Sequence, residues 1–144
     1  MEHQTHLAII GYGHMGQIYK SACEQLCHYK NYENYYKYDL PQFLDNLKLV
    51  AIVDPLLKTS KQDGIHFFNS LDEMLNATSI HINAAVIASP IKTHQPIAKE
   101  LIEKNIDLLI EKPVCKTAAE IKGLIDLAET NNVKLMPGHV ERYN

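Results

Sequence analysis

The 144-residue sequence contains no apolar run near the roughly 20 residues that a membrane-spanning helix needs. It also has no block of basic residues. Its 14 Lys and Arg are outnumbered by 17 Asp and Glu, for a net charge of -3. We therefore expect neither a membrane segment nor a nucleic-acid-binding surface. The first residues lack the basic-then-apolar order of a secretory signal, so we expect a cytoplasmic protein.

Cysteine is scarce, and the three present are an odd number, which argues against a disulfide framework. Cys23 and Cys27 have the spacing of half a zinc site on an expected helix. No second pair of ligands follows at a familiar spacing, so ordinary buried cysteines are favoured and no metal is expected. The apolar fraction of 46% is enough for a single domain with its own core.

Short, fully apolar runs alternate with amphipathic stretches along the chain. This order predicts an α/β domain, a doubly wound parallel sheet of the Rossmann type with about six strands and helices on both faces. Two helices begin with capping boxes, Ser70 with Glu73 and Thr117 with Glu120. The expected strands are residues 7–10, 49–53, 65–68, 84–88, 107–110 and 133–136, and the expected helices span 15–28, from 71, 95–104 and from 118.

Residues 29–46 interrupt this pattern between the first helix and the second strand. A surface insertion is favoured there, because loops tolerate added residues. The alternative is a docking surface for a partner subunit. The segment contains five tyrosines, namely Tyr29, Tyr32, Tyr35, Tyr36 and Tyr38.

A glycine-rich motif follows the first expected strand and opens the first helix. Its first glycine permits a tight turn, its second lets the backbone approach a pyrophosphate, and its third lets helix and strand pack closely. Backbone N–H groups and the positive end of the helix dipole favour the phosphate charge. The motif, which predicts a dinucleotide site, consists of Gly11, Tyr12, Gly13, His14, Met15 and Gly16.

Asp54 ends the second expected strand, where a carboxylate can accept hydrogen bonds from ribose hydroxyls. It would repel a 2'-phosphate, so NAD is favoured over NADP. Its separation from Gly16 exceeds the usual spacing of about 20 residues, and the 29–46 insertion accounts for the excess. The alternative is that Asp54 starts a turn before Pro55. Methyltransferases that use S-adenosylmethionine share the loop and the acid, so they remain an alternative at this point.

Polar residues also follow the fourth expected strand, at the edge of the sheet where ligands bind in open α/β folds. Ser89 and Pro90 come directly after this strand, and Thr93 and His94 follow. Pro90 would stiffen a turn beside the cofactor. His94 has two interpretations, a contact to cofactor or substrate and a place in the first turn of a helix.

Glu111, Lys112 and Pro113 follow the fifth expected strand. A lysine there would lie near the nicotinamide end of a dinucleotide, and its ammonium could stabilise an alkoxide during hydride removal. Glu111 could anchor the lysine, and Pro113 could follow a cis peptide bond. The alternative is an exposed Glu–Lys pair before a proline turn.

With these motifs in place, the sequence resembles the Gfo/Idh/MocA family of nicotinamide-dependent oxidoreductases, which includes glucose-fructose oxidoreductase and inositol dehydrogenase. The resemblance implies that Lys112 positions the substrate and handles a proton beside the nicotinamide, and it makes the methyltransferase alternative the weaker one. The motifs that carry it are the glycine motif, Asp54, Ser89-Pro90, Thr93-His94, Glu111-Lys112-Pro113 and the final Pro137-Gly138-His139-Val140-Glu141-Arg142-Tyr143-Asn144.

Three departures from the family pattern matter. Tyr19 stands where many members have a histidine, and the 29–46 insertion is not typical. Members usually continue into a second α/β domain that supplies most substrate contacts, a further acid–base residue and often a homo-oligomer interface. We therefore expect residues 1–144 to be an NAD(P)-binding domain with little turnover by itself, from an enzyme of sugars, polyols or nucleotide-linked sugars. The alternative is a non-catalytic dinucleotide-binding module that docks through residues 29–46.

Overall fold

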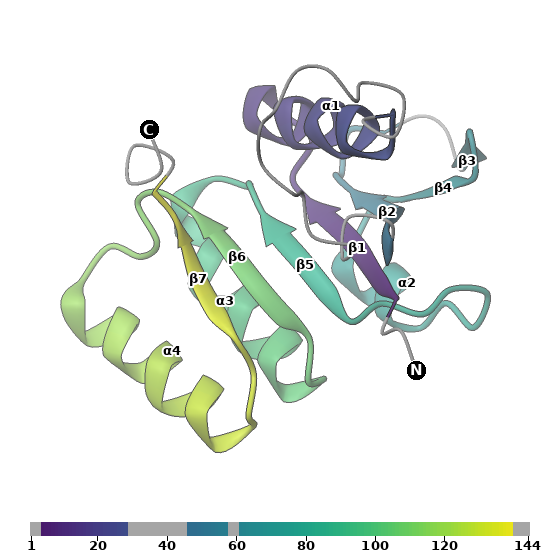
Figure 1. The fold of residues 1–144 in the computed structure, drawn as a ribbon. Helices are drawn as coiled ribbons and strands as arrows, with labels where there is room; N and C mark the ends of the chain where they lie inside the picture. Colours follow the sequence, from purple (N-terminus) through teal and green to yellow (C-terminus); the bar gives the residue numbers. More distant parts are fainter. Residues whose placement is uncertain (1–3, 29–45, 58–60, 140–144) are drawn as a thin grey trace, which may run out of the picture.

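The computed structural model describes residues 4–28, 46–57 and 61–139, and the fold in these ranges alternates strands with helices (Figure 1). The strands are β1 (Thr5–Ile10), β2 (Leu47–Val53), β3 (Lys61–Gln62), β4 (Ile65–Phe68), β5 (Ala84–Ile87), β6 (Asp107–Glu111) and β7 (Leu135–Gly138). The helices are α1 (His14–His28), α2 (Leu71–Leu75), α3 (Ile91–Glu103) and α4 (Ala118–Thr130).

The strands form one seven-stranded sheet in the order β3-β4-β2-β1-β5-β6-β7. Neighbouring strands are parallel from β4 to β7, so the predicted doubly wound sheet is confirmed. Six of these strands correspond to the expected ones, and the seventh is the short edge strand β3, which pairs antiparallel with β4. Two residues, Lys61 and Gln62, are too short a run to give a strand pattern in the sequence.

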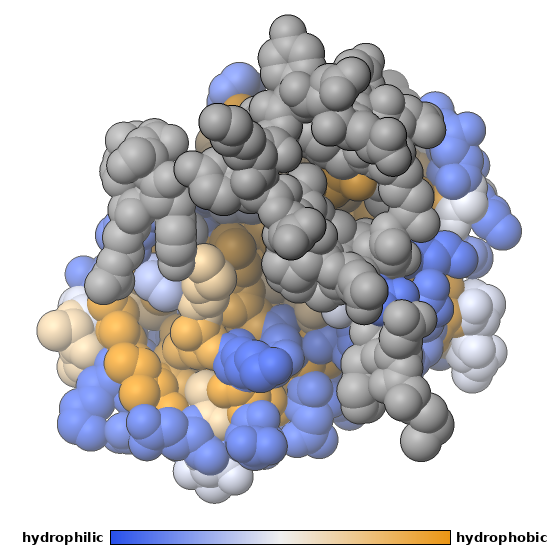
Figure 2. Space-filling model, in the orientation of Figure 1, coloured by the Kyte–Doolittle hydropathy of each residue, from blue (hydrophilic) through white to orange (hydrophobic). Residues whose placement is uncertain are grey.

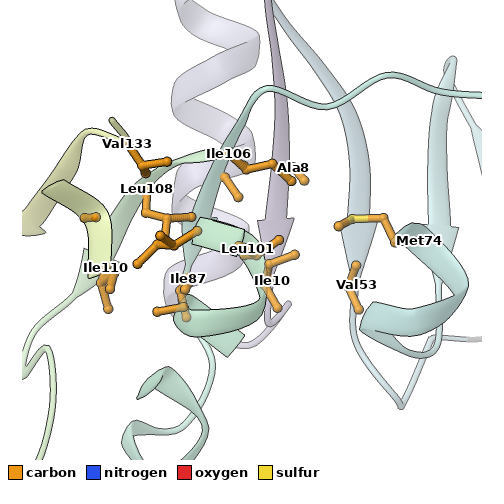
Figure 3. Packing of buried hydrophobic residues seen from close by; sticks show 14 of the residues in the cluster. Ala8, Ile10, Val53, Met74, Ile87, Leu101, Ile106, Leu108, Ile110 and Val133 are labelled. Carbon is orange, nitrogen blue, oxygen red and sulfur yellow. The ribbon is translucent and has the colours of Figure 1, made fainter. Parts of the chain in front are cut away.

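Two apolar clusters divide the core, one on each face of the sheet. Helices α2, α3 and α4 pack on one face, where Met74, Leu101 and Leu124 are fully buried. Figure 3 shows Met74 pointing toward Val53 of β2. The other face carries a smaller cluster centred on Ile9, Ile52, Ile65, Phe67 and Val86, against which Tyr19 of α1 packs.

The described helices cover the two faces of the sheet unequally. Among the described elements, α1 is the helix that packs on the second face, against β1 and β2. Apolar residues show at the surface near β6, β7 and α4 in Figure 2. The exposed apolar side chains include Met136 of the edge strand β7, which is 41% exposed, and Ile125 of α4, which is 43% exposed although α4 packs on the first face.

Most element boundaries follow the sequence pattern, and the exceptions have local causes. Helix α3 starts at Ile91, four residues before the expected start, since Pro90 takes the cap position and Pro96 is accepted within the helix. Strand β7 is shifted by two residues and contains Pro137, which an edge strand tolerates. Of the two expected capping boxes, the one at α4 has both of its hydrogen bonds. At α2 the Ser70 side chain accepts from the Glu73 N–H, but the Glu73 carboxylate accepts from the Asn69 N–H, so that box is only half formed.

The carboxyl ends of β1, β2, β5 and β6 meet at the same edge, because these strands are adjacent and parallel. Each expected motif follows one of these ends. The glycine motif follows β1, Asp54 follows β2, Ser89 lies just beyond β5, and Lys112 follows β6. The topology therefore brings together residues that are far apart in the sequence.

Candidate functional site

The first glycine of the loop lies where three strand ends meet. Gly11 has a φ of +96°, which favours glycine, and its N–H donates to the Val53 carbonyl oxygen at 2.8 Å. A Cβ atom here would lie 2.6 Å from the Ser89 backbone nitrogen. A side chain at Gly11 would therefore push the loop away from the end of β5.

The other two glycines of the motif differ sharply in their surroundings. A Cβ atom on Gly16 would overlap the Gly11 carbonyl oxygen, so the start of α1 packs directly on the loop. Among the described residues, a Cβ atom on Gly13 would meet no atom within 4 Å, and Gly13 is exposed. Packing among the described residues therefore requires glycine at position 16 and does not require it at position 13.

Asp54 fastens the loop to the end of β2. Its Oδ2 accepts a hydrogen bond from the Tyr12 backbone N–H at 2.8 Å, and its Oδ1 accepts one from the Leu56 N–H at 2.9 Å. The carboxylate therefore does start a turn, as the alternative interpretation of Asp54 expected, while its contact to ribose hydroxyls stays a prediction. Each oxygen has a second lone pair, and the side chain is partly exposed.

The three non-glycine residues of the motif have separate positions. The Tyr12 ring packs edge-on against Phe67 at a centroid distance of 6.3 Å, which holds the loop to the smaller apolar cluster. His14 is exposed at the first residue of α1, and Met15 is partly buried beside it. The first turn of α1 contains no acidic residue, so no carboxylate of that turn neutralises the positive end of the helix dipole.

The segment after β5 is braced by hydroxyl groups. The Ser89 Oγ and Thr93 Oγ1 atoms are hydrogen-bonded at 2.7 Å, and Thr93 Oγ1 donates to the Pro90 carbonyl oxygen at 2.7 Å. Thr93 can make both bonds if Ser89 donates to it. Pro90 is the cap residue of α3 and is exposed.

His94 is 2% exposed and joins two loops of the site. Its Nε2 lies 2.7 Å from the Ser89 carbonyl oxygen. Its Nδ1 lies 3.2 Å and 3.1 Å from the carbonyl oxygens of Pro113 and Val114. His94 does lie in the first turn of α3, and both ring nitrogens face backbone acceptors of this chain. A cofactor contact by His94 stays a prediction.

Glu111 is 7% exposed at the end of β6, and it anchors Lys112 through the backbone. Its Oε2 accepts a hydrogen bond from the Lys112 N–H at 3.0 Å. Within the described ranges, the Lys112 ammonium makes no hydrogen bond or salt bridge, and the residue is exposed at the strand edge. The peptide bond between Lys112 and Pro113 is cis, as the sequence suggested.

A residue outside the predicted site completes this arrangement. The Tyr19 hydroxyl donates a hydrogen bond to Glu111 Oε1. Burial, together with the hydrogen bond and the charge of Glu111, raises the pKa of Tyr19 well above its usual range. The signal in the sequence is a phenol on the sheet-facing side of α1, one turn after Gly16, but nothing local identifies a partner 92 residues away.

The cysteines, possible metal ligands and helix lengths also bear on what the chain can do. Cys23 is 6% exposed and Cys115 is 7% exposed, while the Cys27 side chain lies outside those that the structure describes. Burial and the charge of Glu120 raise the pKa of the Cys115 thiol. The described residues include no cluster of three or more His, Cys, Asp or Glu suited to a metal ion. The helices in the described ranges are too short or too polar to cross a membrane.

Residues 5–139 match the model of an oxidoreductase family described as having an NAD-binding Rossmann fold, GFO_IDH_MocA. The chain belongs to this family. The match covers every strand and helix described above, together with the glycine motif, Asp54 and Lys112.

Relatives in the Gfo/Idh/MocA family are distant and longer than this chain. The rhizopine catabolism protein MocA of Rhizobium meliloti is 24% identical over 140 residues, which cover 95% of this chain and 38% of that protein. A UDP-N-acetylglucosamine 3-dehydrogenase of Acidithiobacillus ferrooxidans is 31% identical over 75 residues, which cover 52% of this chain and 23% of that enzyme. The chain thus spans well under half the length of these relatives.

A solved structure supports the fold. GenD2 from gentamicin A biosynthesis, crystallised with NAD, superposes with a TM-score of 0.69 at 24% identity, over 94% of this chain and 34% of GenD2. At this identity the likeness shows the shared Rossmann fold.

Proposed function

We propose that residues 1–144 form the NAD-binding domain of an oxidoreductase that transfers a hydride between NAD and a hydroxyl-bearing carbon of a sugar, polyol or nucleotide-linked sugar. The observation that carries this proposal is the contrast among the loop glycines. Contacts within the chain require glycine at positions 11 and 16, whereas Gly13 has no neighbour within reach of a Cβ atom in the described ranges. A glycine that packing does not require is what close approach of a pyrophosphate to the backbone would demand.

The charge of the loop also suits a pyrophosphate. The start of α1 presents backbone N–H groups that have no partners within the helix, and its first turn lacks acidic residues. In contrast, α2 has Asp72 and Glu73 in its first turn, and α4 has Glu120. Helix α3 also lacks an acidic residue in its first turn, so α1 and α3 are better suited to a ligand anion than α2 and α4 are.

Asp54 supports NAD as the cofactor in preference to NADP. The Tyr12 and Leu56 N–H groups hold its carboxylate at the end of β2 and leave lone pairs for ribose hydroxyls. A 2'-phosphate would bring like charges together at this position. We propose that Asp54 thereby disfavours NADP.

Lys112 is the residue that we assign to the reaction. A bound nicotinamide supplies the hydride acceptor or donor. The exposed ammonium of Lys112, with no internal partner in the described structure, can hydrogen-bond the substrate hydroxyl and stabilise negative charge on that oxygen. Glu111 fixes the backbone from which Lys112 projects.

The substrate class rests on relatives. One relative is named as a UDP-N-acetylglucosamine 3-dehydrogenase, and another, 35% identical over 66 residues, as a putative UDP-kanosamine synthase oxidoreductase subunit of Amycolatopsis mediterranei. These names favour a nucleotide-linked sugar over a free polyol. The match covers 38% of the length of MocA. We further propose that most substrate contacts in this family come from the part of the enzyme that this match does not cover. The chain alone is then expected to bind NAD(H) and to turn over sugars poorly.

The decisive experiment compares two glycine variants by calorimetric titration with NADH and NADPH. We expect wild type to prefer NADH, and Gly13→Ala to weaken NADH binding by about tenfold or more, or about 1.4 kcal/mol, at unchanged stability. Gly123→Ala in α4 is the matched control, because a Cβ there also meets nothing within 4 Å. It should bind NADH as wild type does.

Several results would contradict the proposal. Absence of binding to either nucleotide by wild type would remove the cofactor assignment as a whole. A preference for NADPH would refute the role of Asp54, and so would an Asp54→Asn variant with an undiminished preference for NADH. Robust turnover of a sugar panel by the 144-residue chain would refute the division of labour proposed for the substrate site.

A further inference from the structure

Glu111 is a buried carboxylate whose position depends on its neighbours. Burying a charge is costly unless hydrogen bonds compensate for lost water. Two donors are described here, the Lys112 N–H to Oε2 and the Tyr19 hydroxyl to Oε1. Tyr19 is the donor that comes from a different part of the chain, since the Lys112 N–H belongs to the adjacent residue.

A third contact limits where this carboxylate can lie. Gly138 of β7 pairs with Glu111 in the sheet. A Cβ atom at Gly138 would lie 2.9 Å from Glu111 Oε1 and 3.2 Å from its Cα. The side chain of Glu111 thus lies against Gly138 of β7, and its carboxylate also contacts Tyr19 of α1.

We infer that Tyr19 is a positioning residue, whose hydroxyl fixes the Glu111 carboxylate against the Lys112 N–H and so sets the backbone that presents the Lys112 ammonium. The effect on the cofactor rests on the role proposed for Lys112. The chain of contacts runs from α1, which also begins at the glycine loop, to the end of β6. One helix thereby links the candidate pyrophosphate loop to the candidate catalytic lysine.

The first test needs no cofactor. In ¹H–¹⁵N NMR spectra of the full chain, Tyr19→Phe should shift the Lys112 amide resonance and speed its hydrogen exchange, because the Glu111 carboxylate loses one of the two hydrogen bonds described for it. Tyr19→His, which keeps a donor at this position, should restore much of the wild-type behaviour. The control is Ile106→Val, a small core truncation just before the opposite end of β6, which should leave the Lys112 amide unchanged.

The second test is a double-mutant cycle on NADH affinity, with Lys112→Ala as the second change. Tyr19→Phe should weaken binding about tenfold when Lys112 is present and hardly at all in the Lys112→Ala background. Equal losses in both backgrounds would overturn the inference, and so would an unaltered Lys112 amide in Tyr19→Phe. If wild type binds no NADH, the proposed function fails while the amide experiment still decides the placement of Lys112 by Tyr19.

Discussion

The candidate site has two halves that are held in different ways. In the glycine-loop half, residues 11–16 with Asp54, backbone atoms set the geometry through close packing and N–H bonds. In the lysine half, residues 89–94 and 111–113, buried side chains from distant elements do so, chiefly Tyr19 with Glu111 and His94 with three carbonyl oxygens. The backbone-held half leaves no room for a Cβ atom at Gly11 or Gly16, whereas the side-chain-held half depends on particular hydrogen-bonding side chains.

The largest expected effect is in the glycine-loop half. Gly16→Ala places a Cβ atom on the Gly11 carbonyl oxygen, and neither backbone segment can move freely. We expect a loss of about 3 kcal/mol or more in the free energy of unfolding, measured by urea denaturation. Gly123→Ala, in open space on α4, should instead gain up to about 1 kcal/mol. A Gly16→Ala protein as stable as wild type would mean that close packing does not hold this half.

A smaller effect is expected in the lysine half. His94→Leu keeps a side chain of similar size but removes the imidazole that contacts the Ser89 carbonyl through Nε2 and the Pro113 and Val114 carbonyls through Nδ1. The loss should be about 2 kcal/mol in the free energy of unfolding. His81→Leu, at an exposed position, should stay within about 0.5 kcal/mol of wild type. Equal effects of the two histidine variants would remove His94 as a brace between the loops.

The smallest effect appears only at alkaline pH. Burial and Glu111 raise the pKa of Tyr19 in the folded protein, whereas the unfolded phenol titrates near its usual value of about 10. Above that pH the folded state holds the proton that the unfolded state has lost, so this stabilising contribution declines as pH rises. The free-energy difference between wild type and Tyr19→Phe should therefore shrink above pH of about 10, in unfolding curves measured at several pH values. A difference that grows there would contradict the assigned donor.

The same contrast explains how much of the structure the sequence predicts. The order of elements, the strand at residues 65–68 and the box between Thr117 and Glu120 follow from local patterns, and the structure confirms them. The early start of α3 could not be predicted from the local pattern. Pro96 favours a helix boundary nearby, yet the helix extends on both sides of it. Residues 29–45 lie outside the described ranges, so the interpretation of the tyrosine-rich segment stays a prediction.

The site divides in the same way. Glycine spacing encodes the loop directly, and an acid after a strand is visible in any sequence. The link between Tyr19 and Glu111 is not, because two polar residues far apart in the chain carry no mutual signal. Nor does the pattern around His94 reveal that its ring is enclosed by carbonyl groups, since an exposed and a buried histidine look alike in sequence.

The pairing of Tyr19 with Glu111 also has a consequence for biosynthesis. These residues are 92 positions apart, and a ribosome makes the amino-terminal one first. While the intervening chain is being translated, α1 can lie against β1 and β2, but its phenol has no carboxylate to meet. Helix α1, which begins within the glycine motif, can therefore form its hydrogen bond to Glu111 only after β6 has been synthesised.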